Sequence, residues 1–335
     1  MKGVDLSQFE FDFDLNWAAV FINADGTVYG RYGTQSASGA DAYNSIESLE
    51  KAMSRVLELH KQYPGNAAKL AGKRPPAKPY KTALQMPALD QKEKLHGRTE
   101  RNNCIHCHNI HDAQNRHAQD NGTFMQDLLW RYPLPDNAGF RIDPKDGRKV
   151  ASVEAGSPAA KAGMQPGDAV MEAGGQAILS IADIQWVFHN SPNTATTVGL
   201  VVERDGKSLK KTLSLPAGWK RTDLSWRGSL WSVSPRIRTW APLLKPEELK
   251  ERGLAEDQRV MLVKWINQGT PGGQAMKDAG IREGDLIVGL DGKPLHDTGG
   301  HFHEHIKLNY KIGDELPLDL LRDGKEVRIN VPLVE

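Results

Sequence analysis

The chain contains one domain twice, and this duplication constrains its fold more than any other feature. The heptapeptide AGMQPGD at residues 162–168 is matched by AGIREGD at residues 279–285, 117 positions later. The tetrapeptide RDGK at residues 204–207 recurs at residues 322–325, 118 positions later. Two matches at nearly one offset indicate two copies of one structural unit.

Each copy predicts the same order of elements: a strand, a short helix, the A-G-x-x-x-G-D turn, a strand, a second helix, and a hairpin that turns at R-D-G-K. This order resembles PDZ domains of the bacterial HtrA type, through GSPAAKAGMQPGDAVMEAGG in the first copy and AMKDAGIREGDLIVGLDGKPL in the second. The resemblance places the two PDZ domains at residues 136–215 and 240–335. The chain has no serine-centred nucleophile motif, so protease activity is not carried over, and whether it is an enzyme stays open.

The PDZ resemblance implies capture of protein or peptide C-termini. A PDZ domain adds the ligand as a strand beside its second helix, and backbone N–H groups of a glycine-containing loop hold the terminal carboxylate. In the first copy the peptide-binding residues predicted for the loop and the facing helix are Gly139, Phe140, Arg141, Ile142, Ile184, Val187 and Phe188. In the second copy residues 240–243 take the loop position without a glycine and with Pro242, which lacks an N–H. We therefore expect the first copy to bind peptide and the second to act as a packing module.

The only two cysteines lie in the pentapeptide Cys104-Ile105-His106-Cys107-His108. C-x-x-C-H is the attachment pattern of c-type haem, in which two thiols bond to the haem and the histidine ligates the iron. The pattern predicts a haem-type segment at residues 102–135, with Cys104, Cys107 and His108 binding haem c and His108 holding the iron.

The second iron ligand stays open at this stage. The candidates are Met86, Met125, His60, His96, His111 and His117. The same segment also has acceptable spacing for a zinc site formed by Cys104, Cys107, His111 and His117. A redox dithiol, an inert cysteine pair and copper bound by the many histidines are further interpretations. The separate group His301, His303 and His305 is interpreted as surface histidines on the second helix of the second copy.

Residues 1–64 predict a hairpin followed by a helix. Trp17–Ile22 is a compact apolar strand, residues 24–26 form the turn, and the helix covers about residues 44–62 with Asn44 or Ser45 as its cap. The segment FDFDLNWAAVFINADGTVYGRYG resembles the β-β-α end of a thioredoxin-like fold. It lacks that family's redox motif and the proline before the third strand, so no thiol–disulfide activity is assigned to residues 1–64.

Two connecting segments complete the organisation. Residues 65–101 form a basic, Pro- and Lys-rich linker, for which a solvated tether is expected. Residues 216–239 form a tryptophan-rich connector, in which Trp219, Trp226 and Trp231, together with Trp240 just beyond it, are expected to bury against both PDZ copies.

Composition narrows the class of protein. Apolar residues make up 39% of the chain, charged residues 25%, and the net charge is +1, which is typical of a globular protein and does not favour nucleic-acid binding. The longest apolar run, Trp17–Ile22, is too short to span a bilayer. The fold class expected is therefore multidomain and mainly α+β, with the C-terminal half of a thioredoxin-like fold, a small helical Cys-His segment and two PDZ domains.

The whole order of segments resembles a family of exported bacterial proteins that join a thioredoxin-like domain to PDZ domains, some of them with selenocysteine. The resemblance implies a periplasmic or otherwise exported protein. We hypothesise that Met1 is a start assigned downstream of a selenocysteine codon, because the chain shows neither a signal peptide nor the redox motif. Inspection of the upstream DNA tests this idea.

The function expected is an exported redox-associated scaffold. It would recruit proteins or peptides through the first PDZ domain and carry covalent haem for electron transfer with a redox partner. Two alternatives stay open: a PDZ adaptor without haem, whose Cys-His segment holds structural zinc, and a thiol–disulfide oxidoreductase whose main redox motif lies upstream of this chain.

Overall fold

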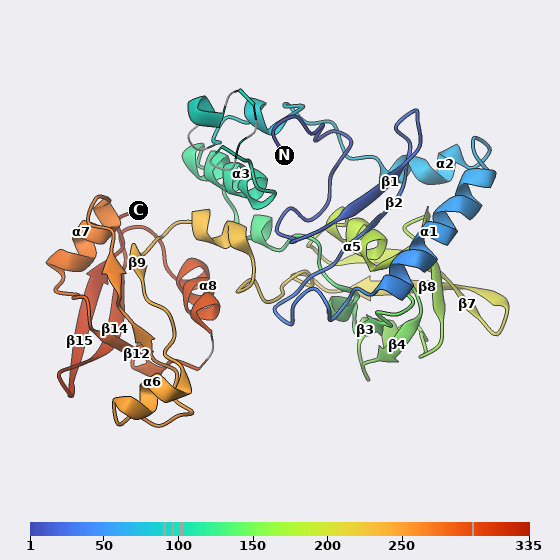
Figure 1. Ribbon diagram of the computed structural model, residues 1–335. Helices are drawn as coiled ribbons and strands as arrows, with labels where there is room; N and C mark the ends of the chain where they lie inside the picture. The colour runs from blue at the N-terminus through green and yellow to red at the C-terminus, as the bar shows by residue number, and fades with distance from the viewer. Residues whose placement is uncertain (90–91, 96, 99, 101–102, 297) are drawn as a thin grey trace. The chain divides into compact units, whose positions relative to one another are not determined.

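A computed structural model describes residues 1–335 except 90–91, 96, 99, 101–102 and 297. The chain divides into two compact units, Met1–Asp223 and Leu224–Glu335, and each is described by itself (Figure 1). The first unit contains the first duplicated copy together with everything N-terminal to it. Residues 1–135 are therefore part of the same compact body as the first copy.

The first copy is built around one antiparallel sheet and one buried helix. Its strands are β3 (Phe140–Ile142), β4 (Val150–Val153), β5 (Ala169–Ala173), β6 (Gln176–Ala177), β7 (Thr196–Arg204) and β8 (Lys207–Leu215). Its helices are α4 (Pro158–Lys161) and α5 (Ile181–His189). The main sheet has the order β6-β5-β7-β8, and β3 pairs with β4. Helix α5 packs into the hydrophobic core that this sheet encloses.

The second copy repeats this order of elements. Its strands are β9 (Thr239–Trp240), β10 (Met261–Leu262), β11 (Trp265–Ile266), β12 (Leu286–Leu290), β13 (Lys293–Pro294), β14 (Glu315–Arg322) and β15 (Lys325–Pro332). Its helices are α6 (Pro246–Glu251), α7 (Pro271–Asp278) and α8 (Gly299–Asn309). The main path is β10-β12-β14-β15, β13 pairs with β12, and β9 pairs with β11. Each copy has its own core, which agrees with the duplication.

An ion pair joins the A-G-x-x-x-G-D turn to the R-D-G-K hairpin in each copy, which explains why the two motifs are repeated together. Arg204 Nε lies 2.6 Å from Asp168 Oδ1, and Arg322 Nε lies 2.7 Å from Asp285 Oδ1. The aspartate closes the A-G-x-x-x-G-D turn and the arginine opens the R-D-G-K hairpin. A second donor of Arg204 reaches the Gly163 carbonyl at 2.9 Å, so the guanidinium joins both turns.

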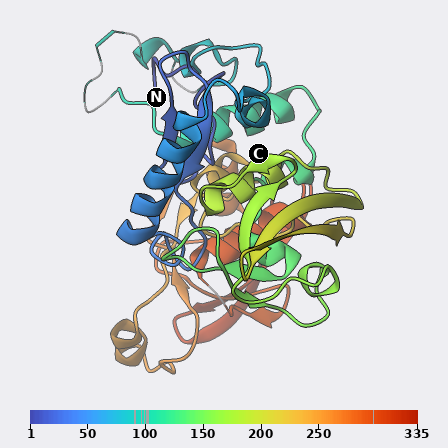
Figure 2. The same cartoon turned by 90° about the vertical axis from the view of Figure 1, so that its right-hand side faces the viewer.

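The N-terminal hairpin consists of β1 (Ala19–Ile22) and β2 (Val28–Tyr32), and helix α1 (Ile46–Lys61) follows it. Ser45 is the cap of α1, because its side chain accepts the Ser48 N–H at 3.1 Å. The two strands form a two-stranded sheet, and this arrangement does not by itself establish a thioredoxin fold. Strand β2 instead packs against α5 of the first duplicated copy, as the blue strands and the yellow-green helix show in Figures 1 and 2.

Part of the segment 65–101, for which a solvated tether is expected, packs against the first unit. The segment contains α2 (Ala67–Leu70) and the 3-10 turns η1 (Ala71–Lys73), η2 (Ala83–Gln85) and η3 (Lys92–Leu95). Leu70, Lys73, Ala83 and Met86 are all buried. The segment packs because its apolar residues belong to hydrophobic clusters of the first unit and because the Lys73 ammonium pairs with a buried carboxylate.

A buried ion pair fixes this segment to α5. Lys73 Nζ lies 2.8 Å from Asp183 Oδ1, and both side chains are at most 1% exposed. Burial lowers the pKa of the Lys73 ammonium, and the charge of Asp183 opposes that shift. The Arg31 guanidinium lies 3.6 Å from the centre of the Trp186 ring and donates to the Lys73 carbonyl at 2.8 Å. Strand β2, turn η1 and helix α5 are thus joined in one contact.

A third apolar cluster surrounds the Cys-His segment. Helix α3 (His108–Asp120) is preceded by the two cysteines and contributes two residues to this cluster. The buried members are Leu6, Phe13, Ala83, Met86, Leu89, Ile105, Ile110 and Ala113. Of the helices described, none has the length and apolar character needed to cross a membrane.

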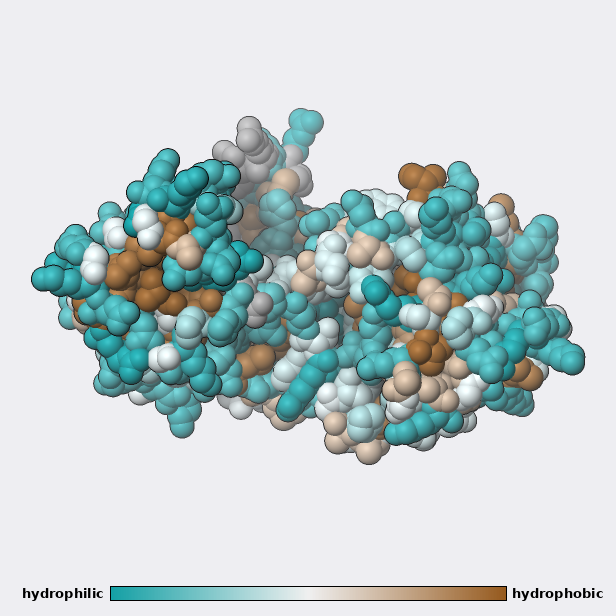
Figure 3. Space-filling view, turned by 90° about the horizontal axis from the view of Figure 1, so that it is seen from below, coloured by the Kyte–Doolittle hydropathy of each residue, from teal (hydrophilic) through white to brown (hydrophobic). Residues whose placement is uncertain are grey.

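The tryptophans in and beside the connector differ in burial. Trp219 is buried in the core of the first copy. Trp231 is 56% exposed and Trp240 is 58% exposed, because Trp240 stands on the outer side of the short β9–β11 pair. Figure 3 shows a patch of hydrophobic residues, bordered by hydrophilic ones, on the surface of the C-terminal unit.

Replacing Lys73 by methionine tests the buried ion pair. The change leaves the Asp183 charge buried without its cation, so we expect the free energy of unfolding of the first unit to fall by about 3 kcal/mol. Urea unfolding of the full chain measures this loss. The matched control is Lys69→Ala, because Lys69 pairs with Glu172 at 3.5 Å but is 69% exposed, and its loss should cost at most about 1 kcal/mol. Equal losses in the two variants would contradict the assignment.

Candidate peptide-binding site and Cys-His segment

Gly139 turns the chain into strand β3. The short turn η5 (Pro135–Ala138) ends at Gly139, whose φ of +82° lies in the left-handed region. A Cβ atom on Gly139 would lie 2.1 Å from the Ser157 Cβ, at the start of α4. The Gly139 carbonyl accepts the Glu154 N–H at 2.8 Å. Only glycine meets both the conformation and the close approach at this position.

The residues after Gly139 alternate as a strand requires. Phe140 and Ile142 point into the core of the first copy, and the side chain of Arg141 points outward. Arg141 Nε lies 3.1 Å from Asp136 Oδ1 at the protein surface. Among the described residues β3 pairs with β4 alone, so its other edge carries no strand.

Helix α5 is buried along nearly its whole length. Ile184, Val187 and Phe188 are exposed by only 0%, 5% and 0% respectively. The Phe188 ring meets the Phe140 ring edge-on, with 6.5 Å between centroids. The predicted helix and strand residues are therefore brought together, but as neighbours in a hydrophobic core.

Other segments of the same chain cover the remaining faces of α5. The Trp219 ring stands edge-on to Phe188 with 5.2 Å between centroids, and its Nε1 donates to the Pro192 carbonyl at 2.8 Å. Gln185 donates to the Tyr132 carbonyl at 2.7 Å and accepts from the Thr34 hydroxyl at 2.9 Å. These contacts fill the surroundings of the helix that a PDZ ligand would otherwise meet.

The loop expected at residues 240–243 of the second copy is wrongly placed. Thr239 of β9 pairs with Ile266 of β11, and Phe140 of β3 pairs with Val153 of β4. In each copy the next helix, α7 or α4, begins the same number of residues after that pair, so Thr239 corresponds to Phe140. Arg238 therefore occupies the position of Gly139, and Trp240 already belongs to β9. Arg238 Nε lies 2.7 Å from Glu335 Oε1, so an internal carboxylate is held beside this turn.

The Cys-His segment presents its groups at the start of α3. Cys104 is exposed, and Cys107 is partly buried against the third apolar cluster. Burial raises the pKa of the Cys107 thiol. His108 is the first residue of the helix, and its Nδ1 lies 3.1 Å from Asp112 Oδ2. That hydrogen bond raises the pKa of His108 and directs the other ring nitrogen, Nε2, away from the carboxylate.

His108 makes one contact of the kind that metal-ligating histidines make. Histidine ligands commonly bind metal through one ring nitrogen while the other is held by a carboxylate or carbonyl, which fixes the ring and raises its basicity. Asp112 holds the Nδ1 of His108 in this way. At least one thiol is open to the surface.

The six candidates for a second iron ligand lie in different surroundings. Met86 is 1% exposed and shares the third cluster with Cys107, whereas Met125 is 64% exposed. His111 is buried, and its Nδ1 lies 3.0 Å from Asp14 Oδ2. His60 is bonded to the Tyr29 hydroxyl and His117 to Asn121, while His96 lies outside the described residues. Met86 is the candidate that packs in the same cluster as Cys107.

The zinc set does not assemble in the structure. Within the part of the chain that is described, the ligand atoms of Cys104, Cys107, His111 and His117 do not form a group within 4.8 Å of one another. His111 gathers instead with Asp12 and Asp14, all three buried. Burial and the positive charge of Arg131 lower the pKa of His111. The cluster of Asp12, Asp14 and His111 therefore already has a cationic neighbour, Arg131, as expected for a structural polar cluster.

Sequence reasoning missed the contacts that cover the helices. A signal was present, because Asp127-Leu128-Leu129-Trp130-Arg131 is matched by residues 223–227, DLSWR. After the first of these segments Tyr132 stacks on His189 with 4.1 Å between ring centroids, and after the second Trp231 lies 4.1 Å from His303. The duplication thus extends upstream of each PDZ copy and includes a segment that packs on its second helix.

Comparison with known families agrees with this fold. Residues 149–202 and residues 254–333 each match the PDZ domain family. The chain therefore carries two PDZ domains, one in each duplicated copy. The similarities described next each cover a part of this chain.

One relative is the probable periplasmic serine endoprotease DegP-like of Pseudomonas savastanoi pv. phaseolicola, 29% identical over 206 residues, which cover 58% of this chain and 39% of that protein. Another is the periplasmic pH-dependent serine endoprotease DegQ of Escherichia coli, 27% identical over 153 residues, which cover 45% of this chain and 30% of that protein. The chain thus spans less than half the length of either relative. The HtrA3 PDZ domain bound to a phage-derived ligand is similar to 29% of this chain, with 82% of that chain covered, 18% identity and a TM-score of 0.23.

Replacing Gly139 by alanine tests the turn into β3. The added Cβ meets Ser157 and the backbone keeps a positive φ, so we expect a loss of about 2–3 kcal/mol in the free energy of unfolding. Gly156→Ala is the matched control, because Gly156 has a φ of +76° but no atom within 4 Å of its Cβ position. Urea unfolding should show a clearly larger loss for Gly139→Ala. A larger loss for the control would contradict the close approach.

Proposed function

We propose that this chain is an exported scaffold that binds protein or peptide C-termini through its first PDZ domain. The observation that carries the proposal is the first PDZ domain's strand β3, which follows the Gly139 turn and pairs on one edge only among the described residues. PDZ ligands add to such an edge as an extra strand. The predicted peptide-binding residues of the first copy lie in the Gly139 turn, in β3 itself and on α5, and they remain the proposed site.

Access to that site is the distinctive feature of the proposal. Because Ile184, Val187 and Phe188 are buried and Trp219 packs on Phe188, a ligand that inserts a side chain beside α5 must displace a segment of the chain itself. Binding would then cost the free energy of that displacement, and the apparent affinity would be lower than for a preformed groove. The protease activity named for the relatives is not proposed here.

The periplasm is the proposed location. The relatives with DegP- and DegQ-type names are described as periplasmic, which supports export of this chain. Attachment of c-type haem also takes place outside the cytosol, so the second function proposed below needs the same location.

Binding of terminal peptides to the full chain tests the first function. We expect a peptide with an apolar last residue and a free carboxylate to bind with a Kd near the micromolar range, about −8 kcal/mol. The same peptide with an amidated C-terminus should bind at least ten times more weakly, because the loop recognises the carboxylate. Fluorescence anisotropy measures both. Equal affinities for the acid and the amide would overturn terminus recognition.

The second candidate function is electron transfer by a covalent haem. Its support is the geometry of His108, whose Nδ1 is held by Asp112, together with the two thiols of Cys104 and Cys107. When bound, the haem would supply one-electron redox chemistry. Cys104 and Cys107 would form thioether bonds, His108 would hold the iron through Nε2, and Asp112 would orient the ring. Each thioether forms by addition of S–H across a vinyl group, so this step needs no oxidant.

Export of the full chain with a haem-attachment system tests this function. We expect one covalent haem per chain, seen by mass spectrometry and by haem staining after denaturing electrophoresis. The double change Cys104→Ala and Cys107→Ala should abolish it. Asp112→Asn should keep the haem attached but change its visible spectrum, because the ring loses its carboxylate partner. A chain that stays free of haem under these conditions would overturn the assignment, and bound zinc in that chain would favour the alternative.

A further inference from the structure

A pocket opens in the first unit between helix α1 and the β5–β6 hairpin of the first PDZ domain. We call it the α1 pocket. Helix α2 and the turn between β3 and β4 complete its walls. The pocket encloses about 380 Å³, which lies within the range of sites for small molecules.

The floor of the α1 pocket is apolar. Leu70, Ile178 and Leu179 are each at most 2% exposed, and Leu59 of α1 is half-buried beside them. Strand β2 closes the space behind this floor, because a Cβ on Gly30 would lie 2.5 Å from the Leu179 side chain and 2.8 Å from the carboxylate of Asp183 on α5. The N-terminal hairpin thus fills the flank of α5 and leaves the floor open on the side of α1.

Two arginines stand at one end of the α1 pocket, and only one of them is bonded to the protein. Arg55 Nη2 lies 2.8 Å from Asp146 Oδ1, and its Nη1 donates to the Leu179 carbonyl at 2.8 Å. The backbone of Arg148 is fixed, because its carbonyl accepts the Val170 N–H at 2.9 Å. The Arg148 guanidinium makes no hydrogen bond or ion pair with the residues that the structure describes.

The charges around this end leave one cation in excess. Lys51, Arg55 and Arg148 stand against the two acids Asp146 and Glu203, and Asp146 is already bonded to Arg55 and lies 3.5 Å from Lys51. Burial and the charge of Arg55 lower the pKa of Arg148, while the charges of Asp146 and Glu203 oppose that shift. An anion bound at this end would relieve the repulsion between the two guanidinium groups.

The other charged residues that line the α1 pocket have partners within the protein. Glu58 lies 2.6 Å from Lys61, and Glu172 lies 3.5 Å from Lys69. Both lysines are 69% exposed, so these pairs belong to the solvated mouth of the pocket. Arg148 is therefore the lining cation that is open to a ligand.

Helix α1 sets the length of the ligand. From Arg55 to Gln62, both of which line the pocket, the helix advances by about 10 Å along its axis. A medium-chain alkyl group such as that of octanoate spans a wall of this length. The pocket thus combines a cation at one end with an apolar floor that runs away from it.

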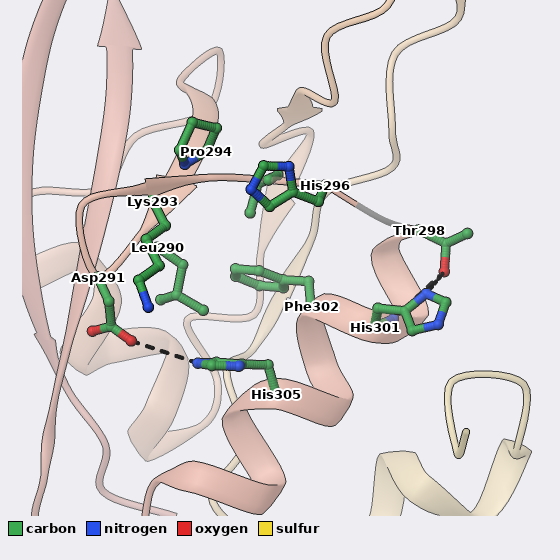
Figure 4. A pocket seen from close by; sticks show the side chains of 10 residues that line it. Leu290, Asp291, Lys293, Pro294, His296, Thr298, His301, Phe302 and His305 are labelled. Atoms are coloured by element: carbon green, nitrogen blue, oxygen red, sulfur yellow. Dashed lines mark hydrogen bonds and ion pairs between the residues drawn. The ribbon is translucent and has the colours of Figure 1, made fainter. Parts of the chain in front are cut away.

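A second pocket, on the second PDZ domain, differs in size and charge (Figure 4). It lies between α8 and the β12–β13 hairpin and encloses about 190 Å³. Lys293 and Asp291 both line it, so their charges offset each other, and Asp291 also lies 3.5 Å from His305. This pocket supplies the control position for the experiment below.

We propose that the α1 pocket binds a medium-chain carboxylate, whose anionic group is held by Arg148 and whose alkyl chain lies on the apolar floor along α1. A guanidinium presents two N–H groups that match the two oxygens of a carboxylate. The inference goes beyond terminus recognition, because none of the residues proposed to bind peptide lines this pocket.

Octanoate tests the proposal on the full chain, by isothermal titration calorimetry at neutral pH. We expect one octanoate to bind per chain, roughly ten times or more as tightly as 1-octanol, which lacks the charge that Arg148 recognises. Octyltrimethylammonium, which carries the opposite charge, should bind more weakly than octanol. Equal affinities for the acid and the alcohol would overturn the proposal.

Variants locate the binding. Arg148→Met should weaken octanoate binding roughly tenfold or more and leave octanol binding unchanged, which would show that the floor is intact. Lys293→Met, which removes the cation of the second pocket, is the matched control and should leave octanoate binding unchanged. A loss of octanoate affinity in Lys293→Met, or none in Arg148→Met, contradicts the assignment.

A peptide C-terminus shares the chemistry of a carboxylate on an apolar body, so the two sources are separated directly. The acid-ended peptide that tests terminus recognition should bind Arg148→Met as tightly as the parent chain. A loss of peptide affinity in this variant would overturn the proposal in favour of a peptide as the occupant. Failure of terminus recognition in the parent chain would leave the expected octanoate results unchanged.

Discussion

The buried ion pair between Lys73 and Asp183 is the constraint on which the first unit depends. An ammonium with no exposure is tolerated only when a carboxylate and further hydrogen bonds replace its water. Arg31 adds two further contacts: its backbone N–H donates to the Asp183 carboxylate, and its guanidinium stacks over the Trp186 ring. These contacts tie the N-terminal hairpin and the Pro/Lys-rich segment to a helix that a PDZ domain uses for ligands. The first PDZ domain is consequently an integral part of a larger body.

The two PDZ copies contain the same internal ion pair, and they differ in what packs on their outer surfaces. In both copies an arginine of the R-D-G-K hairpin pairs with the aspartate of the A-G-x-x-x-G-D turn, Arg204 with Asp168 and Arg322 with Asp285. In the first copy the flank beside the β5–β6 hairpin is filled by the chain itself. In the second copy a pocket opens between α8 and the β12–β13 hairpin on the same flank. Duplication has thus given one closed and one open version of the same surface.

The parts that sequence predicted are those fixed by local chemistry. The duplication, the positive-φ turn at Gly139 and the cap at Ser45 depend on residues close together in the chain, whose types leave few alternatives. The covering of α5 was missed because its contacts join distant residues, and Lys73 and Asp183 are 110 positions apart. A lysine among prolines and other lysines also indicates a solvated segment on composition alone. The thioredoxin-like half and the haem stay predictions, because each needs evidence that neither the fold nor the relatives provide.

Hydrogen exchange along α5 tests the central claim most directly, because amides exchange slowly where tertiary contacts must open first. In the full chain we expect the amides of α5 to be strongly protected. Lys73→Met should accelerate exchange in α5 and in β2 together, with no change in α8 of the second unit. That result would establish that the N-terminal segments hold the helix closed. Exchange in α5 that is unaltered by Lys73→Met, or that accelerates without β2, would contradict the account.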